Sequence, residues 1–395
     1  MTRAALHPDA IAAAAPVTVG YERHSDSPAQ TWLARVLRAL CTAGNLSKAE
    51  IDGLAVASFG LSRDAPLALV AELGLRLSWF SHLPVGGAAG VMALAEAARA
   101  VAAGQARIVA CIAADTHRKG AFQDLVADFS WVWKDAVHPY GEAGPNALFA
   151  AITEDYMRRY DVTRADFGRL CVEQRRHAAA NPHALLRAPM TLDDYLHAPA
   201  VAGPLHLFDC VMPCAGGEGF LVMTTEEAER RGLAWARYAG SAAFFGEIRR
   251  DRPPLGEAFR HLAERLDGMG LLDGIDLVQT YDDYPVMVFL QLEGYGLASP
   301  GEAARLVVDG TTAITGPLAH NTGGGQLSCG QAGAAGGFLG MVEAIRQLTK
   351  QPAGRSAGQR KRALVSGFGL VHHLGGLAHA AAILVPGRAQ EESQA

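Results

Sequence analysis

Short apolar segments of about four to eight residues alternate along the chain with amphipathic segments, and glycines cluster at the boundaries between them. This alternation predicts an α/β protein whose largely parallel sheet is covered by helices on both faces. The clearest example is a glycine-rich turn followed by an alanine-rich helix and a buried strand, all within residues 82–115. The turn has the sequence Val-Gly-Gly-Ala-Ala-Gly at 85–90, so it carries no side chain that can act as a nucleophile.

The order of these segments repeats once within the chain. Each half has a strand after an Ile-Asp pair, a helix that opens with glycines, a further strand and a closing strand. In the first half these segments lie within 46–60, 82–115 and 216–229. In the second half they lie at 271–285, 330–348, 362–373 and 377–386. The repeat predicts a duplicated α/β unit; chance similarity of two glycine- and alanine-rich helices is the alternative. The predicted division is residues 1–115 with 206–232 as the first half, 116–205 as an inserted cap, and 233–395 as the second half.

Composition and charge narrow the class of partner. The chain has 395 residues, a formal net charge of -5 and a pI near 6.3, so it lacks the basic surface that nucleic-acid binding requires. No apolar run reaches the roughly 18 residues needed to span a bilayer, because Glu96 and Arg99 interrupt the alanine-rich helix. No signal region is apparent at the N-terminus, which predicts a cytoplasmic protein. The six cysteines form no CxxC pair, which argues against a disulfide framework and against a metal site.

Seven segments in one order give the chain a specific resemblance. They are "IDGL" (51–54), "GGAAGVMAL" (86–94), "AAANPHALLRAPMTLDDYLHAPAV" (178–201), "LFDCVMPCAGGEGFLV" (207–222), "YDDYPVMVFLQLEGYGL" (281–297), "HNTGGGQLSCGQAGAAGG" (320–337) and "HHLGG" (372–376). In these segments the sequence resembles the thiolase superfamily, and within it the sterol-carrier or lipid-transfer type. The resemblance implies a five-layered αβαβα fold of two similar halves, a homodimer, and a coenzyme A thioester as substrate with no tightly bound cofactor.

The chain departs from the family pattern at its catalytic positions. The family's nucleophilic cysteine, at the start of the first glycine-opened helix, corresponds to Gly87. The histidine of the family's His-Asp-x-Phe motif corresponds to Tyr281, and that of its Gly-His-Pro motif to Gln331. The Asn-x-His-Gly-Gly segment becomes Asn321-Thr-Gly-Gly-Gly, and the C-terminal catalytic loop retains a histidine, His372.

Chemistry without a cysteine is still possible in such a pocket. The main-chain amide of Gly87, at a helix N-terminus, can stabilise a thioester enolate, as an oxyanion hole does. An enolate sink and one acid or base suffice for retro-aldol cleavage beside a thioester. By resemblance to cysteine-free steroid side-chain aldolases of this superfamily, Tyr281 or Tyr284 would move the β-hydroxyl proton, His372 would be a second acid or base, and a small zinc-ribbon/OB-fold protein would be a partner. Each of the three side chains has a structural alternative: the tyrosines as packed aromatics, and His372 as a hydrogen-bonded loop residue.

Further residues are candidates for binding the substrate. His320 and Asn321 precede a glycine run and can bind a substrate oxygen, although turn geometry alone also explains them. Gly330 and Gln331 open the second glycine-rich helix, where the amide of Gln331 can orient a thioester carbonyl or cap the turn. Four basic residues of the cap are candidates for the phosphates of coenzyme A, with a solvated surface as the alternative: Arg118, Lys119, Arg175 and Arg176.

Three functions therefore remain open from the sequence. The leading hypothesis is carbon–carbon cleavage or formation on an acyl-CoA without a cysteine nucleophile. A second hypothesis keeps acyl transfer, with a partner or with Cys214 or Cys329 supplying the thiol, although both cysteines are equally explained as buried structural thiols. The third is a catalytically silent subunit that binds acyl-CoA or supports a partner. All three share one fold, and the fold does not choose among them.

Overall fold

The protein is described by a computed structural model that covers residues 10–62, 64–128, 135, 138–141, 144–246, 256–372 and 375–387. Within these ranges the side chains of residues 125–128, 140, 370–372 and 375 are not described. In the described part of the chain, no helix is both long and apolar enough to cross a membrane.

Ten strands form one continuous sheet, in the order β10-β9-β11-β12-β8-β1-β7-β4-β2-β3. The sheet consists of two groups of five strands with the same pattern of pairing. In each group the second strand from the edge, β2 or β9, is parallel to both of its neighbours. The next three strands, β4-β7-β1 or β11-β12-β8, pair antiparallel with one another. The halves join where β1 pairs antiparallel with β8, with Ala12 opposite Arg237. The strands are β1 (Ile11–Glu22), β2 (Gly53–Ala57), β3 (Trp79–His82), β4 (Val109–Asp115), β7 (Ala215–Thr224), β8 (Trp235–Phe245), β9 (Leu277–Thr280), β10 (Ala319–His320), β11 (Ala363–His372) and β12 (Gly375–Pro386).

This arrangement confirms the duplicated α/β unit and corrects one expectation. The sheet is mixed rather than largely parallel, because each half ends with strands that return antiparallel: β11 and β12 are joined directly as a hairpin, which cannot be parallel. The hydrophobic segments of the sequence indicate which residues form strands. They carry no information about strand direction when both faces are buried.

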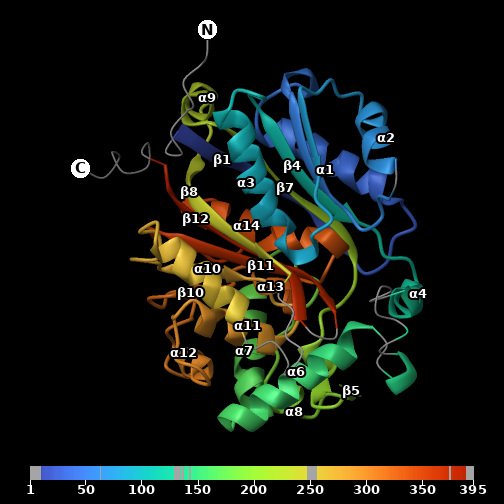
Figure 1. The fold of residues 1–395 in the computed structure, drawn as a ribbon, viewed down its shortest axis with the longest axis vertical. Coiled ribbons are helices and arrows are strands. Elements are labelled where there is room, and N and C mark those ends of the chain that lie inside the picture. The colour runs from blue at the N-terminus through green and yellow to red at the C-terminus, as the bar shows by residue number, and fades with distance from the viewer. Residues whose placement is uncertain are drawn as a thin grey trace.

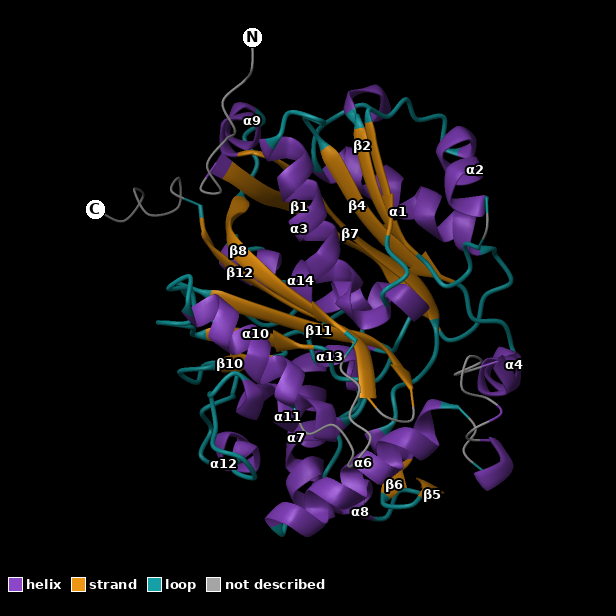
Figure 2. Cartoon of the chain, viewed as in Figure 1, coloured by secondary structure: helices purple, strands orange, loops and turns teal. Residues whose placement is uncertain are grey.

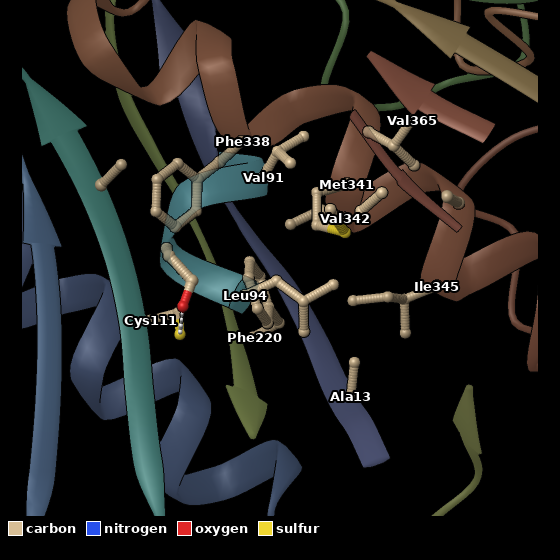
Figure 3. Close-up of a cluster of buried hydrophobic side chains, with 14 of the residues drawn as sticks. Ala13, Val91, Leu94, Cys111, Phe220, Phe338, Met341, Val342, Ile345 and Val365 are labelled. Carbon is tan, nitrogen blue, oxygen red and sulfur yellow. Dashed lines mark hydrogen bonds between the residues drawn. The ribbon is translucent and has the colours of Figure 1, made fainter. Parts of the chain in front are cut away.

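Two helices form the central layer between the halves of the sheet (Figures 1 and 2). They are α3 (Ala89–Ala102) and α14 (Gly336–Leu348), and each contacts strands of both halves. Their small and aliphatic side chains pack with Phe220 and Phe338 into the core shown in Figure 3. Outer helices complete the five layers: α1 (Ala29–Ala43) and α2 (Ala65–Glu72) on the first half, and α10 (Glu257–Asp267) and α11 (Pro285–Gly294) on the second. The five-layered αβαβα fold is thereby confirmed.

An insertion lies between the end of β4 and the start of β7. It packs on the second half of the protein through aromatic contacts, among them Tyr156 with Phe289 and Phe149 with Tyr284. Since β7 begins at Ala215, the connection returns to the sheet nine residues beyond the predicted boundary at 206, and the domain division stays a prediction. The insertion contains α4 (Ala121–Asp128), α6 (Pro145–Tyr160), α7 (Arg164–Ala178), α8 (Leu192–Leu196), β5 (Ala200–Ala202) and β6 (Leu205–His206).

Short elements complete the chain. Two of them matter for the site, because they precede the central helices: the 3-10 turns η3 (Gly86–Ala88) before α3 and η7 (Gly333–Ala335) before α14. The others are α9 (Thr225–Arg230), α12 (Ala303–Val308), α13 (Gly325–Cys329), and 3-10 turns at Lys48–Glu50, His138–Tyr140 and Leu207–Asp209.

Candidate active site

The first turns of the two central helices touch each other. A Cβ atom added to Gly337 would lie 2.8 Å from the carbonyl oxygen of Gly86 and 2.9 Å from that of Gly87. A Cβ atom added to Gly90 would overlap the carbonyl oxygen of Gly337. Only glycine allows this approach of main chain to main chain, which explains the glycine-rich start of both helices. The N-terminal ends of both helix dipoles therefore meet at one place.

Gly87 lies at this place, against the ring of Tyr281. A Cβ atom at position 87 would lie 2.5 Å from Cζ of Tyr281 and would also overlap its Cε2 atom and the carbonyl oxygen of Phe368. These separations are shorter than non-bonded carbon atoms tolerate. Hence a cysteine at position 87 has no room, and the aromatic ring occupies the space of the missing nucleophile.

Tyr281 follows the end of β9, which is the edge of a parallel strand pair where α/β proteins place their ligands. Its amide donates a hydrogen bond to the carbonyl of Ser366 over 3.0 Å, and Nε2 of Gln291 donates to its carbonyl over 2.8 Å. The ring packs edge-on against Phe368. The hydroxyl oxygen accepts a hydrogen bond from Nε2 of Gln331 over 2.8 Å. Gly87, Tyr281 and Gln331, three of the residues predicted from the sequence, thus form one contiguous group.

Electrostatics around Tyr281 oppose its ionisation. Burial raises the pKa of Tyr281 well above its ordinary value, and the neighbouring carboxylate of Asp283 acts in the same direction. The hydrogen bond from Gln331 lowers the pKa, because a donor favours the phenolate. At rest the side chain is a neutral phenol.

Two acidic residues follow Tyr281 and were not assigned from the sequence. The carboxylate of Asp282 accepts hydrogen bonds from the amides of Gln326 and Leu327, over 2.9 and 3.3 Å, and from Nε2 of Gln174 over 3.0 Å. Burial raises the pKa of Asp282 to about 7. It therefore ties α7 and α13 to the loop that carries Tyr281. The adjacent Asp283 is also buried, and its Oδ1 atom has no hydrogen-bond partner. The motif Tyr-Asp-Asp-Tyr was the available signal for both.

Tyr284 faces the insertion. Its hydroxyl donates a hydrogen bond to Oδ1 of Asn146 over 2.5 Å, and its ring stacks on Phe149 with centroids 4.1 Å apart. Burial raises the pKa of Tyr284 well above its ordinary value. These contacts suit a packed aromatic residue that holds α6 to α11.

Gln331 is held by the end of the insertion. Its amide donates to the carbonyl of Met212 over 2.8 Å, and its carbonyl accepts from the amide of Cys214 over 3.0 Å. Gly330, directly before it, has a φ of 102°, and a Cβ atom there would lie 2.9 Å from Sγ of Cys214. Main-chain geometry therefore requires glycine at position 330.

His320 and Asn321 are buried at the end of β9; Asn321 is hydrogen-bonded there, and Nδ1 of His320 has no hydrogen-bond partner. Nε2 of His320 lies 2.8 Å from Oγ1 of Thr280, and burial lowers the pKa of His320 to about 3, so the ring is neutral. Oδ1 of Asn321 accepts from the amide of Thr280 over 2.9 Å. Both side chains hold the end of β9, and their predicted contact with substrate stays a prediction.

The remaining predicted residues lie apart from this group or outside the described atoms. Arg118 and Arg176 are exposed on the insertion, as is Lys119, whereas Arg175 is buried, with its guanidinium over the ring of Phe208. His372 ends β11, and its backbone pairs with Gly375; its side chain lies outside the described residues. The described part of the chain contains no group of three or more residues that could hold a metal ion.

Tyr281 lines a cavity of about 30 Å³, which is room for roughly two water molecules. Gln326 lines it, is 1% exposed, and lowers the pKa of Tyr281. Glu218, Glu343 and Arg346 also line the cavity. Nothing in the sequence around Gln326 indicated this position, because a single glutamine within a glycine-rich run has no distinctive pattern.

The two cysteines considered as replacement nucleophiles are buried. Cys214 and Cys329 are each 1% exposed. Burial raises the pKa of Cys214 to about 12 and that of Cys329 well above its ordinary value. A nucleophilic cysteine needs the opposite environment, electropositive and accessible.

Several known proteins are similar to this chain in fold and in sequence. Residues 266–388 match the family described as Thiolase C-terminal domain-like. The chain is 32% identical over 340 residues, 79% of this chain and 83% of the relative, to the steroid side-chain-cleaving aldolase of Thermomonospora curvata. It is also 32% identical over 356 residues, 85% of this chain and 90% of the relative, to the 17-hydroxy-3-oxo-4-pregnene-20-carboxyl-CoA lyase of Mycobacterium tuberculosis. The solved structure of the Ltp2-ChsH2(DUF35) aldolase superposes with a TM-score of 0.83 at 27% identity, covering 97% of this chain and 99% of that one. The chain therefore belongs to the thiolase superfamily and is an enzyme of that superfamily.

Proposed function

We propose that this enzyme makes or breaks a carbon–carbon bond beside a coenzyme A thioester by aldol chemistry, without an acyl-enzyme. One observation carries the proposal: the ring of Tyr281 occupies the place of the nucleophile at Gly87, and its hydroxyl oxygen accepts a hydrogen bond from Gln331. An acyl-enzyme needs a thiolate there, and an aldol reaction does not. The two relatives described as an aldolase and a lyase support the same conclusion.

The reaction requires one proton transfer and one electron sink. In the cleavage direction Tyr281 first loses its phenol proton to water, and the β-hydroxyl proton then passes to the oxygen of the resulting phenolate. The electrons of that O–H bond form the carbonyl of the departing ketone, and those of the Cα–Cβ bond form the thioester enolate. A proton from water then adds to Cα, so that Tyr281 ends the cycle as the neutral phenol. The amide of Gly87 is the main-chain donor that we assign to the enolate oxygen.

The substrate that we propose is a β-hydroxyacyl-CoA whose β-carbon belongs to a fused ring system. Support comes from the name of the Mycobacterium tuberculosis relative, a lyase of 17-hydroxy-3-oxo-4-pregnene-20-carboxyl-CoA. Exposed Arg118 and Arg176 on the insertion are our candidates for the coenzyme A phosphates, and Asn321, which lines the cavity, together with His320 and Gly330, for the substrate side of the pocket. His372 remains the proposed second acid or base.

Assembly is also proposed. The solved Ltp2-ChsH2(DUF35) aldolase supports a small DUF35-type partner, in line with the zinc-ribbon/OB-fold protein expected from the sequence. We further propose a homodimer in the cytoplasm. In the described residues β3 is an edge strand with one side unpaired, a position at which a second copy can add a strand.

A direct assay tests the function. The protein, alone and co-expressed with a DUF35-type partner, is incubated with 17-hydroxy-3-oxo-4-pregnene-20-carboxyl-CoA, and the products are followed by mass spectrometry. We expect a 17-ketone and propionyl-CoA in equal amounts, because cleavage between C17 and C20 leaves three carbons on the thioester. Acetoacetyl-CoA with free coenzyme A should give no acetyl-CoA. Thiolysis of acetoacetyl-CoA without cleavage of the steroid thioester would contradict the proposal.

A further inference from the structure

We propose that Gln331 is a positioning residue that prepares Tyr281 to accept the substrate proton, and that the insertion holds it in place. The inference rests on the proposed function and assigns Gln331 a role different from the thioester contact expected from the sequence. Its evidence is the hydrogen bond to the tyrosine oxygen together with the main-chain bonds on both sides of residue 331.

The direction of the side-chain hydrogen bond defines the chemistry. Nε2 of Gln331 lies 2.8 Å from the hydroxyl oxygen of Tyr281, and an amide nitrogen can only donate. The tyrosine oxygen therefore accepts, and its own proton points away from Gln331. When Tyr281 becomes a phenolate the same bond becomes charge-assisted and strengthens. Gln331 thus favours the form of Tyr281 that removes a proton from the substrate.

The surroundings of Tyr281 disfavour its phenolate, and the hydrogen bond from Gln331 opposes this effect. Desolvation raises the pKa of Tyr281, and the carboxylate of Asp283 raises it further. Asp282, on the same segment, also raises the pKa of Tyr281, whereas Tyr284 is buried as a neutral phenol. The elements packed against the ring, η3 and β11, bring Gly87 and Phe368, neither of which can titrate. Gln326 of α13 also lowers the pKa of Tyr281, as Gln331 does. The cavity that Tyr281 lines carries three further charged residues, Glu218, Glu343 and Arg346.

The main chain of Gln331 is fixed by residues 212–214, the last part of the insertion. The amide of Gln331 donates to Met212, its carbonyl accepts from Cys214, and the residue pairs with Pro213 as an isolated parallel bridge. A single residue therefore joins the insertion to the tyrosine hydroxyl. The position of residues 212–214 therefore sets the position of the Gln331 side chain relative to Tyr281.

Three substitutions separate this role from others. Gln331→Leu removes the donor, Gln331→Glu replaces it with an acceptor, and Gln331→His retains a ring N–H donor. We expect kcat for cleavage at pH 8 to fall about ten- to a hundred-fold in the Leu variant and further in the Glu variant, because a hydrogen bond to a charged group is lost. KM should be unchanged, and the His variant should stay within a few-fold of wild type.

A matched control is Gln347→Leu. Gln347 is also buried, and its Nε2 bonds to Glu343 and to the carbonyl of Arg355, away from Tyr281. This variant should unfold at a lower temperature and keep its kcat. In wild-type protein, log kcat for cleavage should rise with pH with a slope near one below the pKa of Tyr281, since the phenolate is the reactive form.

The outcomes distinguish this inference from the proposed function. A raised KM with unchanged kcat in Gln331→Leu would show that the amide binds substrate. Equal activity of all three variants would show that Gln331 has only a structural role. Either result overturns the inference. Unchanged turnover in Tyr281→Phe would instead overturn the proposed function itself. The dependence of kcat on pH is measured on wild-type protein, so it remains a test even if a Gln331 variant does not fold. A kcat that does not change with pH would contradict the phenolate as the reactive form of Tyr281.

Discussion

Gly87 and Tyr281 share one space: Cζ of the tyrosine lies 2.5 Å from where a Cβ atom of residue 87 would be. The tyrosine after β9 thus fills the space that a nucleophilic cysteine at position 87 would need. A thiol at position 87 and a phenol at position 281 exclude each other in this backbone. The exchange keeps a polar, reactive group at the helix N-termini and changes its chemistry from covalent to acid–base.

The first prediction concerns this space. Gly87→Ala should lower the free energy of unfolding by about 1–3 kcal/mol or more, as overpacking does, because both the Tyr281 ring and the Phe368 carbonyl must move. Gly20→Ala is the matched control, since a Cβ atom at Gly20 meets nothing within 4 Å. Chemical denaturation of the two variants measures the difference. A Gly87→Ala protein as stable as Gly20→Ala would show that the two residues do not compete for space.

The second prediction separates the two tyrosines. Tyr284→Phe removes the hydrogen bond to Asn146 and should cost about 1 kcal/mol of unfolding free energy while turnover stays within a few-fold. Asn146→Ala should have a similar effect, and the double variant should lose less than the sum, since both remove one bond. Denaturation and steady-state kinetics on the four proteins form the test. A large loss of kcat in Tyr284→Phe alone would give Tyr284 the catalytic role.

The third prediction concerns the thiols. Cys214→Ser and Cys329→Ser should each retain carbon–carbon cleavage, and iodoacetamide should label neither cysteine in the folded protein within the time that inactivates a thiolase. Peptide mass spectrometry locates any label, with urea-unfolded protein as the positive control. Rapid labelling of Cys214 or Cys329 together with loss of turnover would restore acyl transfer as the function.

The fourth prediction is a pH dependence of stability. Glu218 is fully buried, accepts hydrogen bonds from Thr18 and Tyr21, and has its pKa raised by burial from 4.5 to about 7. Its contribution is therefore fully present below pH 4.5 and is lost as the pH rises to about 7, because the unfolded chain ionises first. Relative to wild type, Glu218→Gln should gain on the order of 3 kcal/mol across this interval. Denaturation at pH 4.5 and pH 8 checks this, and a constant difference between the two proteins would refute it.

The sequence determined much of the fold and only part of the site. The repeated Ile-Asp strands and glycine-opened helices predicted two similar halves, because both patterns are local. The antiparallel junction of β1 and β8 was not predictable, since it joins strands more than two hundred residues apart. Gly87, Tyr281 and Gln331 were identified singly by their positions in family motifs. Their contact depends on the crossing of α3 and α14, which no local pattern records.

His320 and Asn321 show the opposite limit. Next to three glycines they resemble a turn that can meet substrate, yet both are buried at the end of β9. Burial of a polar residue depends on what covers it, here the helix α7, whose His177 contacts the carbonyl of Asn321. Gln326 was missed for the same reason: its place beside Tyr281 becomes evident only once the surrounding cavity is known.

The most direct measurement is the turnover of Tyr281→Phe on a β-hydroxyacyl-CoA, with the circular dichroism spectrum and unfolding temperature as controls for folding. The account predicts a folded protein whose kcat is at least about a hundred-fold lower, the usual contribution of a positioned acid or base. A folded Tyr281→Phe protein with wild-type kcat would contradict the account.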